Sequence, residues 1–176
     1  MFAGWQTFFQ TTAEAAATLT GLVFVVVTLS AGRQNSSAST NGARLFTSPT
    51  VFHLTSVLVI SALALMPCSQ LPTLAEAVTV MMGLWALGFL IYAGVVLNDI
   101  LRLDSHSHWS DLWCYGVAPT MAYAWLTAAA VAACLRMAYA PHAMALGLIA
   151  LLLICIRNAW DLATWLAPRR DPPPQG

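Results

Sequence analysis

The chain has 176 residues, of which 59% are hydrophobic and only 8% are charged, whereas soluble domains carry roughly 25% charged residues. A soluble domain of this length needs a charged surface that this composition does not provide, so lipid must surround most of the chain. The net charge is zero, which argues against a nucleic-acid partner.

Five apolar segments predict five transmembrane helices, at approximately residues 11–31, 49–67, 73–97, 118–136 and 142–163. Each is near the length of roughly 20 residues that crosses a hydrocarbon core about 30 Å thick. We therefore expect residues 1–167 to form one all-α integral membrane helical bundle. The tail, residues 168–176, is polar and rich in proline, and is expected to be disordered.

The first predicted span is preceded by aromatic residues between Phe2 and Phe9, which indicate a short helix at the membrane interface. Thr11 and Glu14 then fit a capping box, with Thr11 as the N-cap of the first span and Glu14 at its third position. A polar loop is expected over residues 33–48, and Pro49 suits the first turn of the second span.

Residues 109–115 carry Trp109, Trp113 and Tyr115 and look like a second interfacial element, placed before a fourth span that opens near Pro119.

The arginines predict the orientation of the bundle, because cytoplasmic loops of membrane proteins carry an excess of positive charge. With five crossings, Arg136 stands alone on one side of the membrane. The other side has Arg33, Arg44, Arg102, Arg157, Arg169 and Arg170. We therefore expect the N-terminus outside and the C-terminus inside.

Two helices carry small residues at a spacing of four, which lets helix backbones approach closely in a membrane. These residues are Ala13, Ala17 and Gly21 in the first span and Ala124, Ala128 and Ala132 in the fourth. Such stripes serve either packing within the bundle or the contact between subunits of a homo-oligomer.

Glu14 needs an explanation, because a carboxylate within hydrocarbon costs a few kcal/mol. As part of a capping box it would satisfy backbone N–H groups at a helix start. Alternatively it is a proton or cation site, with Thr18 one turn deeper on the same face. Thr18, Thr20 and Thr28 either continue this polar track or donate to carbonyls of their own helix.

A second polar group, Arg157, Asn158 and Asp161, lies on the last span. Arg157 and Asp161 are four residues apart, so they share a helix face and can pair. If the helix ends at Asp161, the charged groups reach the headgroups. If it continues to Leu166, Arg157 is about 14 Å from the inner end and needs a partner or water.

The chain contains no sequence motif of an enzyme, so we expect a non-enzymatic protein without a cofactor. His106 and His108 resemble a metal-binding pair, but their spacing is generic and no metal site is expected. His53 lies near the start of the second span. Cys68 and Cys134 both fall near the outer face, where a disulfide is one alternative to free thiols.

Two stretches, FFQTTAEAAATLTGLVFVVVTLS (Phe8 to Ser30) and IRNAWDLATWL (Ile156 to Leu166), resemble small uncharacterised multi-spanning proteins of the bacterial inner membrane. They cover about a fifth of the chain. Some of these proteins carry an automatic label as modulators of the FtsH protease, although no protease-binding feature is evident here. The resemblance implies a multi-pass protein of the bacterial cytoplasmic (inner) membrane, with Glu14 and the Arg157–Asp161 group as distinctive polar positions.

These features favour two functions. The first is a homo-oligomeric channel for ions or protons, with Glu14, Thr18, Arg157, Asn158 and Asp161 along its pathway. The second is an accessory or regulatory protein that binds another membrane protein or complex and conducts nothing. In both, the lipid bilayer and a protein partner are the expected surroundings.

Overall fold

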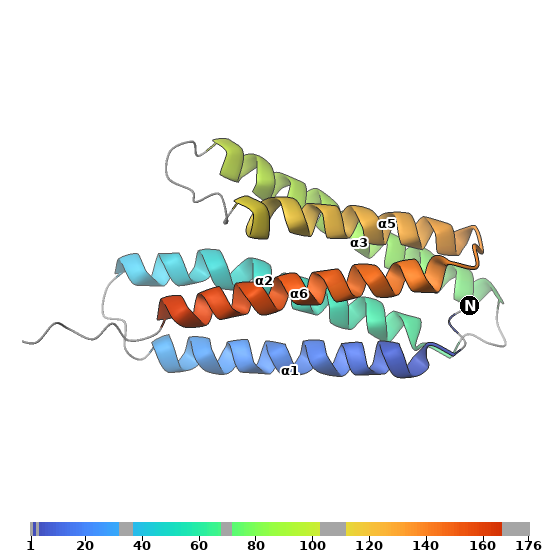
Figure 1. Ribbon diagram of the computed structural model, residues 1–176, viewed down its shortest axis with the longest axis horizontal. Helices are drawn as coiled ribbons and strands as arrows, with labels where there is room; N and C mark the ends of the chain where they lie inside the picture. The colour runs from blue at the N-terminus through green and yellow to red at the C-terminus, as the bar shows by residue number, and fades with distance from the viewer. Residues whose placement is uncertain (1, 3, 32–36, 68–71, 103–111, 167–176) are drawn as a thin grey trace, which may run out of the picture.

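The computed structural model describes residues 2, 4–31, 37–67, 72–102 and 112–166. Every element in this part of the chain is helical, which confirms the all-α prediction (Figure 1). The elements are α1 (Gln6–Ala31), α2 (Ser37–Ala64), α3 (Pro72–Arg102), the π-helix η1 (Leu112–Val117), α5 (Ala118–Cys134) and α6 (Ala140–Leu166).

The α-helices alternate in direction along one long bundle (Figure 1). The start of α1 therefore lies at the same end as the α5–α6 turn, and the end of α6 lies at the opposite end. The main contacts join α1 to α2 and α3 to α5, while α6 packs against α1, α2 and α5. This arrangement makes α6 the central helix that connects the two pairs.

Four helical segments are long and apolar enough to cross a membrane: Gln6–Leu29, Pro72–Asn98, Leu112–Cys134 and Ala140–Thr164. The apolar part of α2, Pro49–Ala64, is shorter. Length and composition therefore indicate a multi-pass membrane protein.

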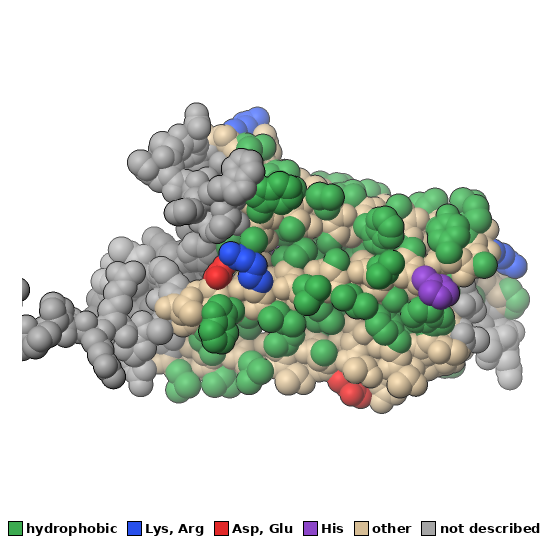
Figure 2. Space-filling model, viewed as in Figure 1, with side chains coloured by type: hydrophobic (Ala, Val, Ile, Leu, Met, Phe, Trp, Pro, Cys, Tyr) green, Lys and Arg blue, Asp and Glu red, His purple; other side chains and the backbone are tan. Residues whose placement is uncertain are grey.

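Large apolar side chains cover the outside of the bundle (Figure 2). Examples more than half exposed are Leu22, Phe24, Leu84, Ile91 and Leu153. Water would penalise this surface, whereas lipid tails are as apolar as these side chains and favour it.

Two glycines lie where neighbouring helices are in close contact. A Cβ atom added at Gly147 would lie 2.6 Å from Leu126 Cδ2, so α5 and α6 are in contact at this glycine. At Gly83 an added Cβ would lie 3.4 Å from the Ala130 Cβ, so α3 and α5 also pack through small residues. Such contacts gain dispersion energy where no hydrophobic drive brings helices together.

The start of α1 differs from the prediction. The helix begins at Gln6, so Thr11 lies inside it and donates its hydroxyl to the Thr7 carbonyl at 2.9 Å. Thr11 is therefore not an N-cap, and Glu14 is not part of a capping box. The aromatic residues form no separate interfacial helix, because Phe8 and Phe9 belong to the first turn of α1 and the Phe9 ring is fully buried.

Two further boundaries differ. The loop predicted over residues 33–48 is helical from Ser37 onward, and α2 contains Pro49 in its interior. The segment before Pro49 includes Ala, Arg and Leu, which have high helix propensity, so the helix can extend ahead of the proline. The interfacial element predicted over residues 109–115 is partly described: η1 runs directly into α5. Residues 103–111, with His106 and His108, and the tail 168–176 lie outside the described residues.

Candidate functional site

The carboxylate of Glu14 lies on the outward face of α1. The inward face of this helix consists of Phe9, Thr12, Ala16 and Val23, all buried, whereas Glu14 is exposed. The Gln10 side-chain amide donates a hydrogen bond to Glu14 Oε1 at 3.0 Å. The only hydrogen-bond partner of this carboxylate among the described side chains is therefore a neighbour on its own helix.

Glu14 also lies deep along α1. It follows Gln6 by eight residues, which is about 12 Å along the helix axis. If the apolar segment Gln6–Leu29 crosses the bilayer, the carboxylate is inside the hydrocarbon rather than at its border. The helix start at Gln6 thus removes the capping explanation and leaves an exposed carboxylate in the apolar segment Gln6–Leu29.

The threonines of α1 bond within their own helix. Thr18 donates to the Glu14 carbonyl at 2.8 Å, Thr20 to the Ala16 carbonyl at 2.8 Å and Thr28 to the Phe24 carbonyl at 3.0 Å. Of the two alternatives, all three threonines thus show the hydrogen bond to the preceding turn. Thr18 is exposed beside Glu14, so its oxygen still lies on the same outward face.

The small-residue stripes are placed differently on the two helices. On α1, Ala13 is half-buried, and Ala17 and Gly21 are exposed. On α5, the stripe turns from outside to inside, because Ala124 and Ala128 are exposed and Ala132 is buried. A Cβ added at Gly21 would meet no atom within 4 Å. The α1 stripe therefore has no close neighbour at Gly21 in the part of the chain that the structure describes, and a subunit contact there stays a prediction.

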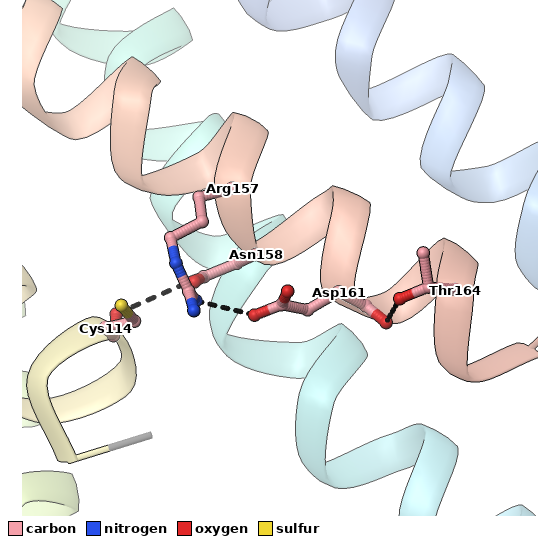
Figure 3. A network of polar contacts seen from close by, with 5 residues as sticks. All are labelled: Cys114, Arg157, Asn158, Asp161 and Thr164. Atoms are coloured by element: carbon pink, nitrogen blue, oxygen red, sulfur yellow. Dashed lines mark hydrogen bonds and ion pairs between the residues drawn. The ribbon is translucent and has the colours of Figure 1, made fainter. Parts of the chain in front are cut away.

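The second predicted group lies on α6, which continues to Leu166. The longer of the two predicted helices is therefore the observed one. Arg157 Nη1 donates to Asp161 Oδ2 at 2.6 Å, and the two side chains are 43% and 39% exposed. The Thr164 hydroxyl donates to the Asp161 carbonyl at 2.9 Å. The two charges thus compensate each other on the α6 surface (Figure 3).

Asn158, the next residue, is fully buried in the bundle. Its amide Nδ2 donates to the Cys114 carbonyl of η1 at 3.4 Å, a long hydrogen bond (Figure 3). Its Oδ1 has no hydrogen-bond partner among the described residues. A π-helix offers carbonyls outside the regular helical pattern, and this contact uses one of them.

The two predicted groups are not joined within one chain. Glu14 bonds to Gln10 on α1, and Arg157 bonds to Asp161 on α6. Each polar group therefore has its hydrogen-bond partner on its own helix, and Glu14, bonded to a neutral amide, has no opposite charge beside it in the described part of the chain. The arrangement forms no single polar seam among the described residues.

A buried polar contact that was not predicted lies between α2 and α5. His53 Nδ1 and the Tyr123 hydroxyl are 2.9 Å apart, and the two residues are 1% and 0% exposed. The Phe89 ring of α3 stacks on Tyr123 with centroids 5.5 Å apart. This contact links the α1–α2 pair with the α3–α5 pair in the interior of the bundle.

The sequence contains a pattern that indicates the buried position of His53. Thr50, His53 and Ser56 recur every three residues and are all buried, which places them on one face of α2. A polar face within an apolar helix indicates an interior position. Tyr123 carried no such signal, because tyrosine is also common at membrane interfaces.

A second charged pair lies at the end of the bundle where α1 begins. Arg136 Nη2 and Glu76 Oε1 are 2.6 Å apart, with side chains 71% and 61% exposed. Cys134, nearby at the end of α5, is a free cysteine, while Cys68 lies outside the described residues. The described residues contain no group of three side chains suited to hold a metal ion.

Comparisons with known proteins add no function. No protein-family model matches the chain, and neither a curated protein nor a solved structure matches it. The resemblance to small bacterial inner-membrane proteins therefore stays a prediction.

Proposed function

We propose that the protein is a non-enzymatic membrane protein with five spans, its N-terminus outside and its C-terminus inside the bacterial inner membrane. Support comes from the alternating helix directions (Figure 1) and from the arginines. Arg136 is at one end of the bundle and Arg102, which closes α3, is at the other. The positive-inside rule then places the Arg102 end in the cytoplasm.

We further propose that copies of the chain associate through the outward face of α1 and conduct protons or small ions along it. The observation that supports this is the exposed Glu14 carboxylate, eight residues into the long apolar helix α1. A carboxylate within hydrocarbon costs a few kcal/mol on insertion scales. Association that removes Glu14 from lipid and brings water to it would offset this cost.

The residues around Glu14 suit a helix–helix contact. Ala17 and Gly21 follow it on the exposed face, and the open space above Gly21 admits a neighbouring backbone. Thr18 adds a hydroxyl oxygen beside the carboxylate. Around an oligomer axis, these polar groups would line a path while the small residues bring the α1 helices together.

A second candidate function is an accessory protein that binds another membrane protein through the same face. The observation that favours it is the Arg157–Asp161 pair, which is closed on α6 at 2.6 Å. Because these two charges pair with each other, a pathway along α1 would have no charged residues at its inner end to act as a gate. In this case α1 would meet a helix of a different protein, and no flux would occur.

Oligomeric state and flux together test the proposal. Native mass spectrometry of the detergent-purified chain measures the number of copies, and a pH-sensitive dye in liposomes measures proton entry. We expect a closed homo-oligomer whose flux is abolished by Glu14→Gln. Glu76→Gln is the matched control, because Glu76 is 61% exposed at the bundle end and should leave flux unchanged.

Gly21→Leu tests the association face separately. No atom lies within 4 Å of a Cβ at Gly21 or at Gly88 of α3, so leucine fits both positions in a single chain. Gly21→Leu should dissociate the oligomer, and Gly88→Leu should not. Flux that persists in Glu14→Gln would refute the channel, and a monomer without flux that co-purifies with one defined membrane protein would establish the accessory function.

A further inference from the structure

A cavity of about 620 Å³ lies between the start of α3, the end of α5 and the start of α6. Its lining includes Glu76, Arg136, Cys134, Val80 and Met137. The Glu76 and Arg136 side chains are largely exposed, and Val80 and Met137 form an apolar part of the cavity wall. The cavity thus combines one positive charge, one negative charge and an apolar surface.

Aromatic residues at this end of the bundle indicate that the cavity lies at the level of lipid headgroups. At the same end of the bundle, Trp5 packs against His142 with ring centroids 4.7 Å apart, and Tyr139 is 59% exposed in the α5–α6 turn. Aromatic residues of this kind mark the boundary between hydrocarbon and water in membrane proteins.

The backbone at Arg136 is unusual. Its φ is 56°, and it is the one non-glycine residue with a positive φ in the described chain. Its N–H donates to the Ala133 carbonyl at 3.0 Å, and the Met137 N–H donates to the Ala132 carbonyl at 2.9 Å. These two bonds form a Schellman motif, in which glycine is the preferred residue at the left-handed position. An arginine here is unfavourable for the turn, and it places a guanidinium at the cavity.

We propose that this cavity binds the headgroup of a zwitterionic phospholipid of the ethanolamine type. Its phosphodiester would pair with Arg136, its ammonium would pair with Glu76, and the glycerol end would lie against Val80 and Met137. An arginine guanidinium is a strong donor to phosphate oxygens. The existing Glu76–Arg136 pair is no obstacle, because exposed ion pairs contribute little to stability and can open to admit a ligand.

Native mass spectrometry with added phosphatidylethanolamine tests this assignment. Arg136→Gly removes the guanidinium and supplies the residue that the turn prefers, so the melting temperature should be equal or higher while lipid affinity falls at least tenfold. Arg102→Gln, at the other end of α3, is the matched control and should retain the lipid. Glu76→Gln should weaken binding of phosphatidylethanolamine more than binding of phosphatidylglycerol, which has no ammonium group.

Maleimide labelling of Cys134 supplies a second measurement, in a variant where Cys68 and Cys114 are replaced by alanine. Because Cys134 lines the cavity, bound phosphatidylethanolamine should slow its labelling severalfold. Equal lipid retention by the wild-type chain and Arg136→Gly would overturn the proposal. Equally tight binding of water-soluble glycerophosphoethanolamine would also overturn it, since the occupant would then be a soluble phosphodiester.

Discussion

Removing the Tyr123 hydroxyl should destabilise the bundle, because this hydroxyl is the described partner of a buried histidine nitrogen. Tyr123→Phe keeps the ring that stacks on Phe89 at 5.5 Å and deletes only the group 2.9 Å from His53 Nδ1. Tyr123 is 0% exposed and His53 is 1% exposed, so bulk water cannot readily replace the lost hydrogen bond.

The expected magnitude follows from two comparisons. Leaving a buried polar group unpaired costs about 1–3 kcal/mol in proteins generally. Hydrogen bonds between membrane helices are weaker on average, about 0.6 kcal/mol with a maximum near 1.7 kcal/mol. Since both partners here are fully buried, we expect Tyr123→Phe to lower the free energy of unfolding by about 1–1.7 kcal/mol.

Reversible unfolding in mixed micelles with increasing SDS measures this change, with tryptophan fluorescence as the signal. Tyr139→Phe is the matched control, because Tyr139 is 59% exposed and should behave as wild type. A double-mutant cycle that combines Tyr123→Phe with His53→Leu measures the interaction between the two side chains. The double variant should be about 1 kcal/mol more stable than the sum of the two single losses of stability predicts. A coupling below about 0.3 kcal/mol would show that the contact contributes nothing specific to the bundle.

Two other predictions follow from packing and exposure. Gly147→Ala should cost about 1–3 kcal/mol of stability, because its Cβ would lie 2.6 Å from Leu126 Cδ2. Gly88→Ala has open space and should be neutral in the same unfolding assay, so equal effects of the two substitutions would contradict this account of the α5–α6 contact. A membrane-impermeant maleimide added to intact cells should label Cys134, which is exposed, from the outside. The buried Cys155 should react only after unfolding, and labelling of Cys134 only after cell lysis would reverse the proposed orientation.

Local sequence rules were reliable for some helix boundaries and failed at others. The start of α5 at Ala118 agrees with the Pro119 signal, since proline suits a first turn. The prediction of a capping box at Thr11 and Glu14 was wrong, because the helix already begins at Gln6, more than one turn before Thr11. Thr11 then satisfies its hydroxyl on the Thr7 carbonyl, an option open to any threonine in a helix.

The candidate site was also only partly predictable. The spacing of Arg157 and Asp161 predicts their ion pair, because residues four apart share a helix face. The contact between His53 and Tyr123 joins residues 70 positions apart, and no local pattern specifies which distant side chains will meet. The outward position of Glu14 could not be predicted either, since it depends on which side of α1 contacts the other helices.

The sequence by itself determined that this is an all-helical membrane protein, because an apolar chain in lipid must satisfy its backbone hydrogen bonds within each helix. The tertiary structure decided how each helix is rotated about its axis. Phe9 and Ala16 face inward while Phe24 and Leu22 are exposed on the outside of the bundle, although all four are apolar. In a bilayer, side chains of equal polarity fit either environment, so packing between helices decides which of them become the core.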